Sequence, residues 1–157
     1  MLQWMHDERV IQGLQPGKFR ENTIEDCKRF IASCEDQSVN CHMAIVDELD
    51  VYQGTVSLKA IDREAKDAEF AIVLRYDAWG KGFAFQAMRD ILKIAFEEYG
   101  LNEVYWNVLC GNLTARRLYD KPPYRPRENV CDRWMAHAPK QADVVFYSVT
   151  KEDFVNA

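Results

Sequence analysis

The chain has 157 residues, of which 48% are hydrophobic and 29% charged, and its formal net charge is −5. We expect one domain over residues 1–157, because this length fits a single core and the composition excludes a disordered chain. The acidic balance disfavours a nucleic-acid-binding protein, which would carry a basic surface, and it suits a cationic partner such as an amine.

The sequence indicates a cytoplasmic protein. Charge appears too early for a signal peptide, and no apolar run approaches the ~18 residues of a membrane span. The cysteines are odd in number and none has CxxC spacing, which indicates free thiols; they are Cys27, Cys34, Cys41, Cys110 and Cys131. Although His42 follows Cys41, no second ligand pair accompanies them, so we expect core packing and no metal site.

The first half of the chain predicts short helices followed by a β-meander. Residues 3–10 read as a short helix, a loop follows at Pro16-Gly17, and Thr23 to Asp26 reads as a capping box that starts a second helix. Three strand patterns joined by tight polar turns then predict an antiparallel meander, with Gly54 as a bulge; they cover residues 41–48, 51–61 and 68–75.

The second half begins with the segment WGKGFAFQAMRDILKIAFEEYG, residues 79–100. Its apolar residues recur at helical spacing from Ala84 to Tyr99. A strand at 103–110 follows, so a strand, glycine loop, helix and strand predict a right-handed crossover between parallel strands. A helix at 113–121, ended by Pro122-Pro123, and a strand at 143–150 complete a mixed α+β fold.

The two glycines before the long helix favour an anion site. A helix N-terminus carries unpaired N–H groups and partial positive charge, and glycine lets a phosphate come close to them. A Walker loop is excluded, because Gly82 stands where Ser or Thr would follow Lys81. A dinucleotide-binding loop fits poorly, because the glycines lie several residues beyond the preceding strand and the upstream strands form hairpins.

The stretches RYDAWGKGFAFQAM and CGNLTARRLYDKPPY together resemble the GNAT superfamily of acyl-CoA-dependent N-acetyltransferases. Within it they are most similar to the RimJ/RimL-like branch of ribosomal-protein alanine acetyltransferases, and LQWMHDERV, AEFAIVL and DVVFYSV are similar to further motifs of that branch in the same order. The resemblance implies a GNAT-like α+β fold: a mostly antiparallel sheet with helices on both faces and a βαβ crossover that carries the pyrophosphate loop.

The resemblance also implies the cofactor, acetyl-CoA, and the residues that hold it. The pyrophosphate would be bound by the backbone of the loop residues Gly80, Lys81, Gly82, Phe83 and Ala84. Ile72, Val73 and Leu74 would present backbone groups to the pantetheine where their strand splays from the next, and an N–H near Val73 or Leu74 would stabilise the oxyanion. Asn112 matches a family residue that contacts pantetheine; an N-cap role is the alternative.

Tyr119 matches the family tyrosine that protonates the departing thiolate, and packing in the core is its alternative role. Glu69, or a water, is the expected base for the amine: its apolar neighbours in sequence suggest a raised pKa, and an exposed position on a strand is the alternative. His6, His42 and His137 are weaker candidates for the base.

Three features depart from the family pattern. Asp77 stands near the loop, and we expect it to point away from the pyrophosphate. Pro122-Pro123 replaces a glycine C-cap, so the turn after Tyr119 must differ. We expect the usual first strand to be missing: either the start site is short, or an edge strand is absent or supplied by a partner chain, as in a homodimer.

We therefore predict acetyl transfer from acetyl-CoA to a primary amine by direct attack, without a metal. The acceptor would be a protein N-terminus, an amino sugar, a polyamine or an antibiotic amine, contacted by the N-terminal helices and the region 124–140. The alternative is a non-catalytic coenzyme A-binding or protein-interaction module on the same fold.

Overall fold

The computed structural model describes residues 1–14, 17 and 19–157, so the predicted Pro16-Gly17 loop lies in part outside the described residues. A six-stranded sheet forms the centre of the fold. Its strands are β1 (Cys41–Val46), β2 (Tyr52–Asp62), β3 (Asp67–Leu74), β4 (Glu103–Leu109), β5 (Arg125–Arg127) and β6 (Val144–Thr150). They are arranged in the order β1-β2-β3-β4-β6-β5.

The predicted antiparallel meander of β1, β2 and β3 is confirmed. Its first turn is held by Asp47, whose carboxylate accepts hydrogen bonds from the backbone N–H groups of Leu49 and Val51, both at 2.9 Å. The bulge predicted at Gly54 falls one residue earlier, because the register with β1 shifts between Tyr52 and Gly54. Gly54 is glycine for another reason: a Cβ there would lie 2.1 Å from the carbonyl oxygen of Val73.

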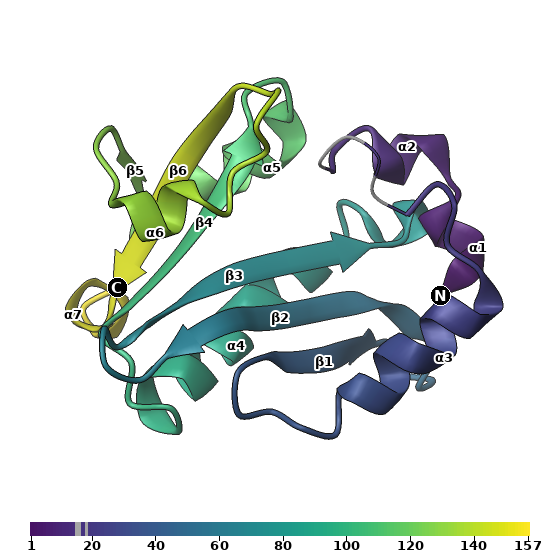
Figure 1. The fold of residues 1–157 in the computed structure, drawn as a ribbon, viewed down its shortest axis with the longest axis horizontal. Helices are drawn as coiled ribbons and strands as arrows, with labels where there is room; N and C mark the ends of the chain where they lie inside the picture. The colour runs from purple at the N-terminus through teal and green to yellow at the C-terminus, as the bar shows by residue number, and fades with distance from the viewer. Residues whose placement is uncertain (15–16, 18) are drawn as a thin grey trace.

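The predicted crossover is also confirmed, since β3 and β4 are parallel and α4 (Phe83–Glu97) connects them. The apolar stripe of α4 packs on one face of the sheet, behind β2 and β3 in Figure 1. Its buried residues are Ala87, Met88, Ile91, Leu92, Ala95 and Phe96. Each large side chain among them contributes about 1.5–3 kcal/mol by leaving water, so this face is the main core.

The N-terminal helices lie at one end of the molecule, beyond the ends of β2 and β3 in Figure 1, and are α1 (Leu2–Met5), α2 (Glu8–Ile11) and α3 (Ile24–Ser33). The single helix expected at 3–10 is wrong: Asp7 takes an extended conformation and caps a second helix by accepting from Arg9 N–H. The capping box of α3 is confirmed, with Thr23 and Asp26 bonded reciprocally. Trp4 and Met5 of α1 pack in a second buried cluster with Val10 and Cys27.

The C-terminal half contains elements that the sequence did not predict. After β4 and α5 (Leu113–Tyr119) come β5 and α6 (Asp132–Met135), and α7 (Lys151–Val155) follows β6; a 3-10 turn, η1 (Tyr76–Ala78), precedes the glycine loop. Trp134 of α6 stacks on Tyr105 of β4 at 4.2 Å between ring centroids, on the sheet face opposite α4. Helices thus cover both faces, as the resemblance implied. Within the described part of the chain, no helix has the length and apolarity needed to cross a membrane.

Candidate active site

The site lies where β3 and β4 diverge. Their parallel pairing runs only from Asp67 opposite Glu103 to Glu69 opposite Tyr105. Beyond that point the two strands separate, and Figure 1 shows β4 and β6 turning away from β3. A cavity of about 760 Å³ occupies this region and is lined by residues of both strands, including Ile72 and Asn107. The divergence expected at this strand is therefore present.

The glycine loop forms one end of this cavity. Gly80 and Gly82 have φ of 72° and 85°, in the left-handed region, and Gly82 is the N-cap of α4. A side chain at either position would be strained, which accounts for both glycines. Since the first N–H groups of a helix have no partner within the helix, the loop and helix start can receive a phosphate. The residues present therefore fit the pyrophosphate of coenzyme A.

The cavity brings together nearly all of the predicted cofactor residues. It is lined by Ile72, Val73, Leu74, Gly80, Gly82, Phe83, Ala84 and Asn112. Lys81 is the exception, since it is exposed and does not line the cavity. Asp77 is exposed, lies 3.5 Å from Arg75 and does not line the cavity.

The end of β3 is anchored on one side and open on the other. Antiparallel pairing with β2 continues to Gly54 opposite Leu74, whereas pairing with β4 has already ended. Trp79 donates a hydrogen bond from Nε1 to the carbonyl oxygen of Leu74 at 3.2 Å, which fixes the strand end next to the loop. The edge of β3 that faces the divergence can therefore pair with an extended ligand such as the pantetheine arm.

Asn112 has the N-cap role that was the alternative to contact with pantetheine. Its side-chain oxygen accepts from Ala115 N–H at 3.1 Å, which caps α5. Its Nδ2 donates to the carbonyl oxygen of Gly13 at 3.1 Å, so the residue also ties the N-terminal segment to the mouth of the cavity. A Cβ at Gly13 would lie 2.9 Å from that Nδ2 atom, so a side chain there would displace the Asn112 amide.

Tyr119 lines the cavity and is also packed in the core, with only 5% of its surface exposed. Its ring makes edge contacts with Phe70 and Trp106, at centroid distances of 6.4 and 5.2 Å. Burial, together with the nearby Tyr124 and Tyr147 hydroxyls, raises the pKa of Tyr119 well above its ordinary value. The phenol is therefore protonated at neutral pH. After Tyr119, α5 ends at Asp120, whose φ is −75° and whose N–H donates to the carbonyl oxygen of Arg116.

The expected environment of Glu69 is wrong. The side chain is buried, with 5% exposed, but it is neither among apolar groups nor on an exposed edge. Its carboxylate lies 3.1 Å from Lys59 Nζ and 2.9 Å from His137 Nδ1. The sequence could not show this, because Lys59 comes from the neighbouring strand and His137 from a segment 68 residues later.

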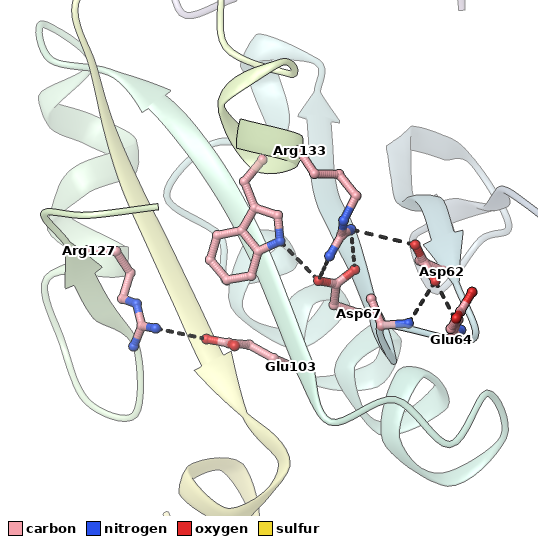
Figure 2. A network of polar contacts seen from close by, with 8 residues as sticks. Asp62, Glu64, Asp67, Glu103, Arg127 and Arg133 are labelled. Atoms are coloured by element: carbon pink, nitrogen blue, oxygen red, sulfur yellow. Dashed lines mark hydrogen bonds and ion pairs between the residues drawn. The ribbon is translucent and has the colours of Figure 1, made fainter. Parts of the chain in front are cut away.

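An ion-pair network holds α6 against β3 next to Glu69. Arg133 donates to both carboxylate oxygens of the buried Asp67, and Trp134 Nε1 donates to the same group at 3.0 Å (Figure 2). Asp62 adds a longer contact to Arg133 at 4.0 Å. This network fixes α6 against β3, and it thereby sets the position of His137 beside Glu69.

The cavity also contains two polar residues, His42, which the sequence suggested only as a weaker candidate for the base, and Ser57, which the sequence did not single out. His42 Nδ1 and Ser57 Oγ lie 2.7 Å apart on β1 and β2 and both line the cavity. Their strands pair with His42 directly opposite Ser57. Strand alternation could have placed each residue on one face, but the pairing of the two depends on the register.

The acceptor region differs in part from the prediction. The N-terminal segment does line the cavity, through residues that include Trp4, Leu14 and Phe19. By contrast, no residue of the fully described region 124–140 is among the lining residues. That region instead packs on Tyr105 and bonds to Asp67 and Glu69 from outside the cavity. Among the described residues, no group of three or more His, Cys, Asp or Glu side chains is placed to hold a metal ion.

Comparison with known sequences identifies the family. The model of the acetyltransferase (GNAT) domain matches residues 1–122. An uncharacterized N-acetyltransferase, p20, of Bacillus licheniformis is 28% identical over 122 residues, which are 78% of this chain and 67% of that protein. The putative ribosomal N-acetyltransferase YdaF of Bacillus subtilis (strain 168) is 28% identical over 105 residues, 64% of this chain and 55% of that protein.

Solved structures support the same fold. Spermidine N-acetyltransferase from Vibrio cholerae, in complex with CoA and spermine, superposes with a TM-score of 0.81 at 17% identity, covering 99% of this chain and 90% of that chain. A chimera of that enzyme (K23-Q34, with hSSAT) gives a TM-score of 0.77 at 18% identity, covering 99% and 94%. At these identities the likeness establishes the fold.

Proposed function

Because this chain belongs to the family of GNAT acetyltransferase domains, which transfer an acetyl group from acetyl-CoA to an amine, we propose that its acceptor is a primary amine in a molecule without a second ammonium group near it, such as a peptide N-terminus. The chain is an N-acetyltransferase domain. Its acceptor, its site residues, its cytoplasmic location and the extent of the domain over residues 1–157 are parts of this proposal.

The observation that carries the proposal is the continuity of the cavity. One cavity of about 760 Å³ runs from the glycine loop, past the free edge of β3, to the polar wall around Glu69. A volume of this size accommodates an extended cofactor arm and a small acceptor. Acetyl-CoA bound at the loop would place its thioester along β3, and the amine would approach from the N-terminal helices.

Each predicted residue has a role in this arrangement. The backbone of Gly80 to Ala84 would hold the pyrophosphate, with Lys81 contributing charge at the exposed side. Ile72, Val73 and Leu74 would bind pantetheine, and an N–H near Val73 or Leu74 would stabilise the oxyanion. Asn112 would contact the arm while it caps α5.

Tyr119 would donate the proton to the departing thiolate. Its raised pKa keeps the phenol protonated at neutral pH, so the hydroxyl is available to donate to the developing thiolate. Glu69 remains a predicted base, and its carboxylate already contacts Lys59 Nζ at 3.1 Å.

The acidic groups of the cavity argue against a polyamine. Among the described lining residues, the carboxylates are Asp26 and Glu69. Asp26 bonds to Thr23 and Arg29, and Glu69 to Lys59 and His137, so both already have partners. A second ammonium group would meet no free carboxylate there, whereas aromatic residues such as Trp4 and Phe19 suit an apolar acceptor.

The finer assignment to the RimJ/RimL-like branch is part of the same proposal. It is supported by the motif order and by the likeness to a protein named as a putative ribosomal N-acetyltransferase. The spermidine acetyltransferases share the fold at 17–19% identity.

Calorimetric titration with acetyl-CoA, with NADH as the control, tests the first step. Micromolar binding of acetyl-CoA alone is expected. A competition assay should then offer an alanine-initiated peptide, spermidine and glucosamine, with mass-spectrometric detection of the products. Preference for the peptide supports the proposal; preference for spermidine overturns the acceptor assignment; binding without any product supports the non-catalytic alternative.

A further inference from the structure

We propose that His42 and Ser57 form a proton relay that carries a proton away from the acceptor amine during acetyl transfer. This inference rests on the proposed function and deepens it, because it assigns the role of base to a pair other than Glu69. Ser57 would touch the amine, and His42 would act through Ser57 as the final proton acceptor.

The geometry of the pair is that of a relay. The Ser57 hydroxyl and His42 Nδ1 are 2.7 Å apart, which is hydrogen-bond distance, and both residues line the cavity. Ser57 is only 5% exposed, so little solvent competes for its hydroxyl. The Phe30 ring packs against the imidazole in a T-shaped arrangement, with centroids 4.9 Å apart, and this contact restricts the imidazole.

The sheet register places Ser57 close to the expected thioester. Ser57 lies opposite Ala71 of β3, and its neighbour Thr55 lies opposite Val73. With strands about 4.8 Å apart and two residues spanning about 6.8 Å, the Cα atoms of Ser57 and Val73 are separated by about 8 Å. That distance leaves room for an amine nitrogen between the Ser57 hydroxyl and a carbonyl held at Val73.

Glu69 occupies a less suitable place. It lies opposite Lys59, whereas Ser57 lies opposite Ala71, so along the strands Glu69 is further from Val73 than Ser57 is. This is the end of the cavity where β3 and β4 still pair. Its carboxylate is bonded to both Lys59 and His137. Accepting a proton would weaken the ion pair with Lys59, and this cost does not arise at Ser57.

The proton balance assigns a definite task to the relay. An ammonium that becomes an amide loses two N–H protons: one ends on the sulfur of coenzyme A as the C–S bond breaks, and the other must leave the site. The Ser57 oxygen accepts this second proton while its own hydroxyl proton passes to His42 Nδ1. Serine is regenerated, and the imidazolium releases its proton to solvent.

The charges around His42 keep the ring ready to accept. Burial, and then the positive charge of Lys59, lower the pKa of His42 below its ordinary value. The other titratable residues that line the cavity are Glu69 of β3, Asp26 and Cys27 of α3, Tyr119 of α5 and Met1 with its N-terminal amine. The imidazole is therefore neutral at neutral pH, and it becomes unable to accept a proton when the pH falls through its pKa.

The test compares the variants His42→Gln, Ser57→Ala and Glu69→Gln with the wild type. Each is assayed with acetyl-CoA and an alanine-initiated peptide between about pH 5 and 9, the range in which histidine titrates. We expect His42→Gln to lower kcat about 100-fold and to remove the acid-side fall of kcat/KM. Ser57→Ala should lower kcat by a similar factor, whereas Glu69→Gln should keep the acid-side fall.

His6→Gln is the matched control, because His6 does not line the cavity and bonds to the backbone of Asn22. Acetyl-CoA affinity, measured by calorimetry, should be unchanged in all variants, which shows that they are folded. A wild-type kcat and pH profile in His42→Gln would overturn the inference, as would loss of the acid-side fall in Glu69→Gln alone; full activity of Ser57→Ala would overturn the relay. Failure of the proposed function looks different, because the wild type itself would then acetylate no amine.

Discussion

The carboxylate of Glu69 lies 2.9 Å from His137 Nδ1, and this contact joins the central strand β3 to the segment after α6. The position of His137 relative to Glu69 depends on other residues. Arg133 and Trp134 bond to Asp67, two residues before Glu69 on the same strand, and thereby fix α6 (Figure 2). The wall of the cavity therefore depends on a surface helix that does not itself line the cavity.

Replacing Arg133 with Met should destabilise the protein. The buried carboxylate of Asp67 would lose a two-armed ion pair, and breaking charged hydrogen bonds of this kind costs about 1.5–3 kcal/mol. Urea unfolding measures the loss. Arg127→Met is the matched control, because its pair with Glu103 is longer, at 3.7 Å, and exposed on the arginine side; its effect should stay within about 1 kcal/mol. Equal effects of the two variants would contradict the role of α6.

Replacing Gly82 with Ala should weaken acetyl-CoA binding at least tenfold in calorimetry. The left-handed φ of 85° would strain an alanine by about 1–2 kcal/mol, and the shifted loop would no longer receive the pyrophosphate. Gly100→Ala carries a similar strain at φ 66°, beyond the other end of α4. That control should lose stability and keep its affinity; a loss of affinity in both variants would assign the effect to strain alone.

Replacing Tyr119 with Phe should lower kcat by about 100-fold and leave acetyl-CoA affinity unchanged, because an acid contributes only during turnover. The raised pKa of Tyr119 also has a pH consequence. The acid must stay protonated, so this residue should cause no alkaline loss of activity below its ordinary pKa of about 10. Tyr147→Phe removes a hydroxyl that bonds to Asp120 outside the cavity, and it should keep the wild-type kcat. Unchanged turnover in Tyr119→Phe would end its assignment as the acid.

Two substitutions separate the roles of Asn112. Asn112→Asp keeps an oxygen that can accept from Ala115 N–H, but it loses the donor to Gly13. It should retain the helix cap and raise the KM for acetyl-CoA. Asn112→Ala loses both the cap and the donor. Its free energy of unfolding, measured with urea, should therefore also fall by about 1 kcal/mol. If Asn112→Asp leaves KM unchanged, the side chain serves the fold and does not contact the cofactor.

Much of the fold follows from local patterns in the sequence. The alternating strands, the capping box at Thr23 and the helical spacing of α4 each depend on neighbours within a few residues, and the structure confirms them. The short helices α6 and α7 were not predicted, since four or five residues carry too little periodicity to be detected. The helix expected at 3–10 divides because Asp7 can cap as well as continue a helix.

The sequence by itself determined the glycine loop at the start of α4, because backbone conformation and helix polarity are local properties. It also predicted that β3 and β4 would be parallel, since a helix connects them. Only the tertiary structure decided which polar and charged side chains contact one another. Glu69 acquired Lys59 and His137, and His42 acquired Ser57, through strand register and through the docking of α6. The proton chemistry of a side chain depends on groups within a few ångströms, and these groups are distant in the sequence.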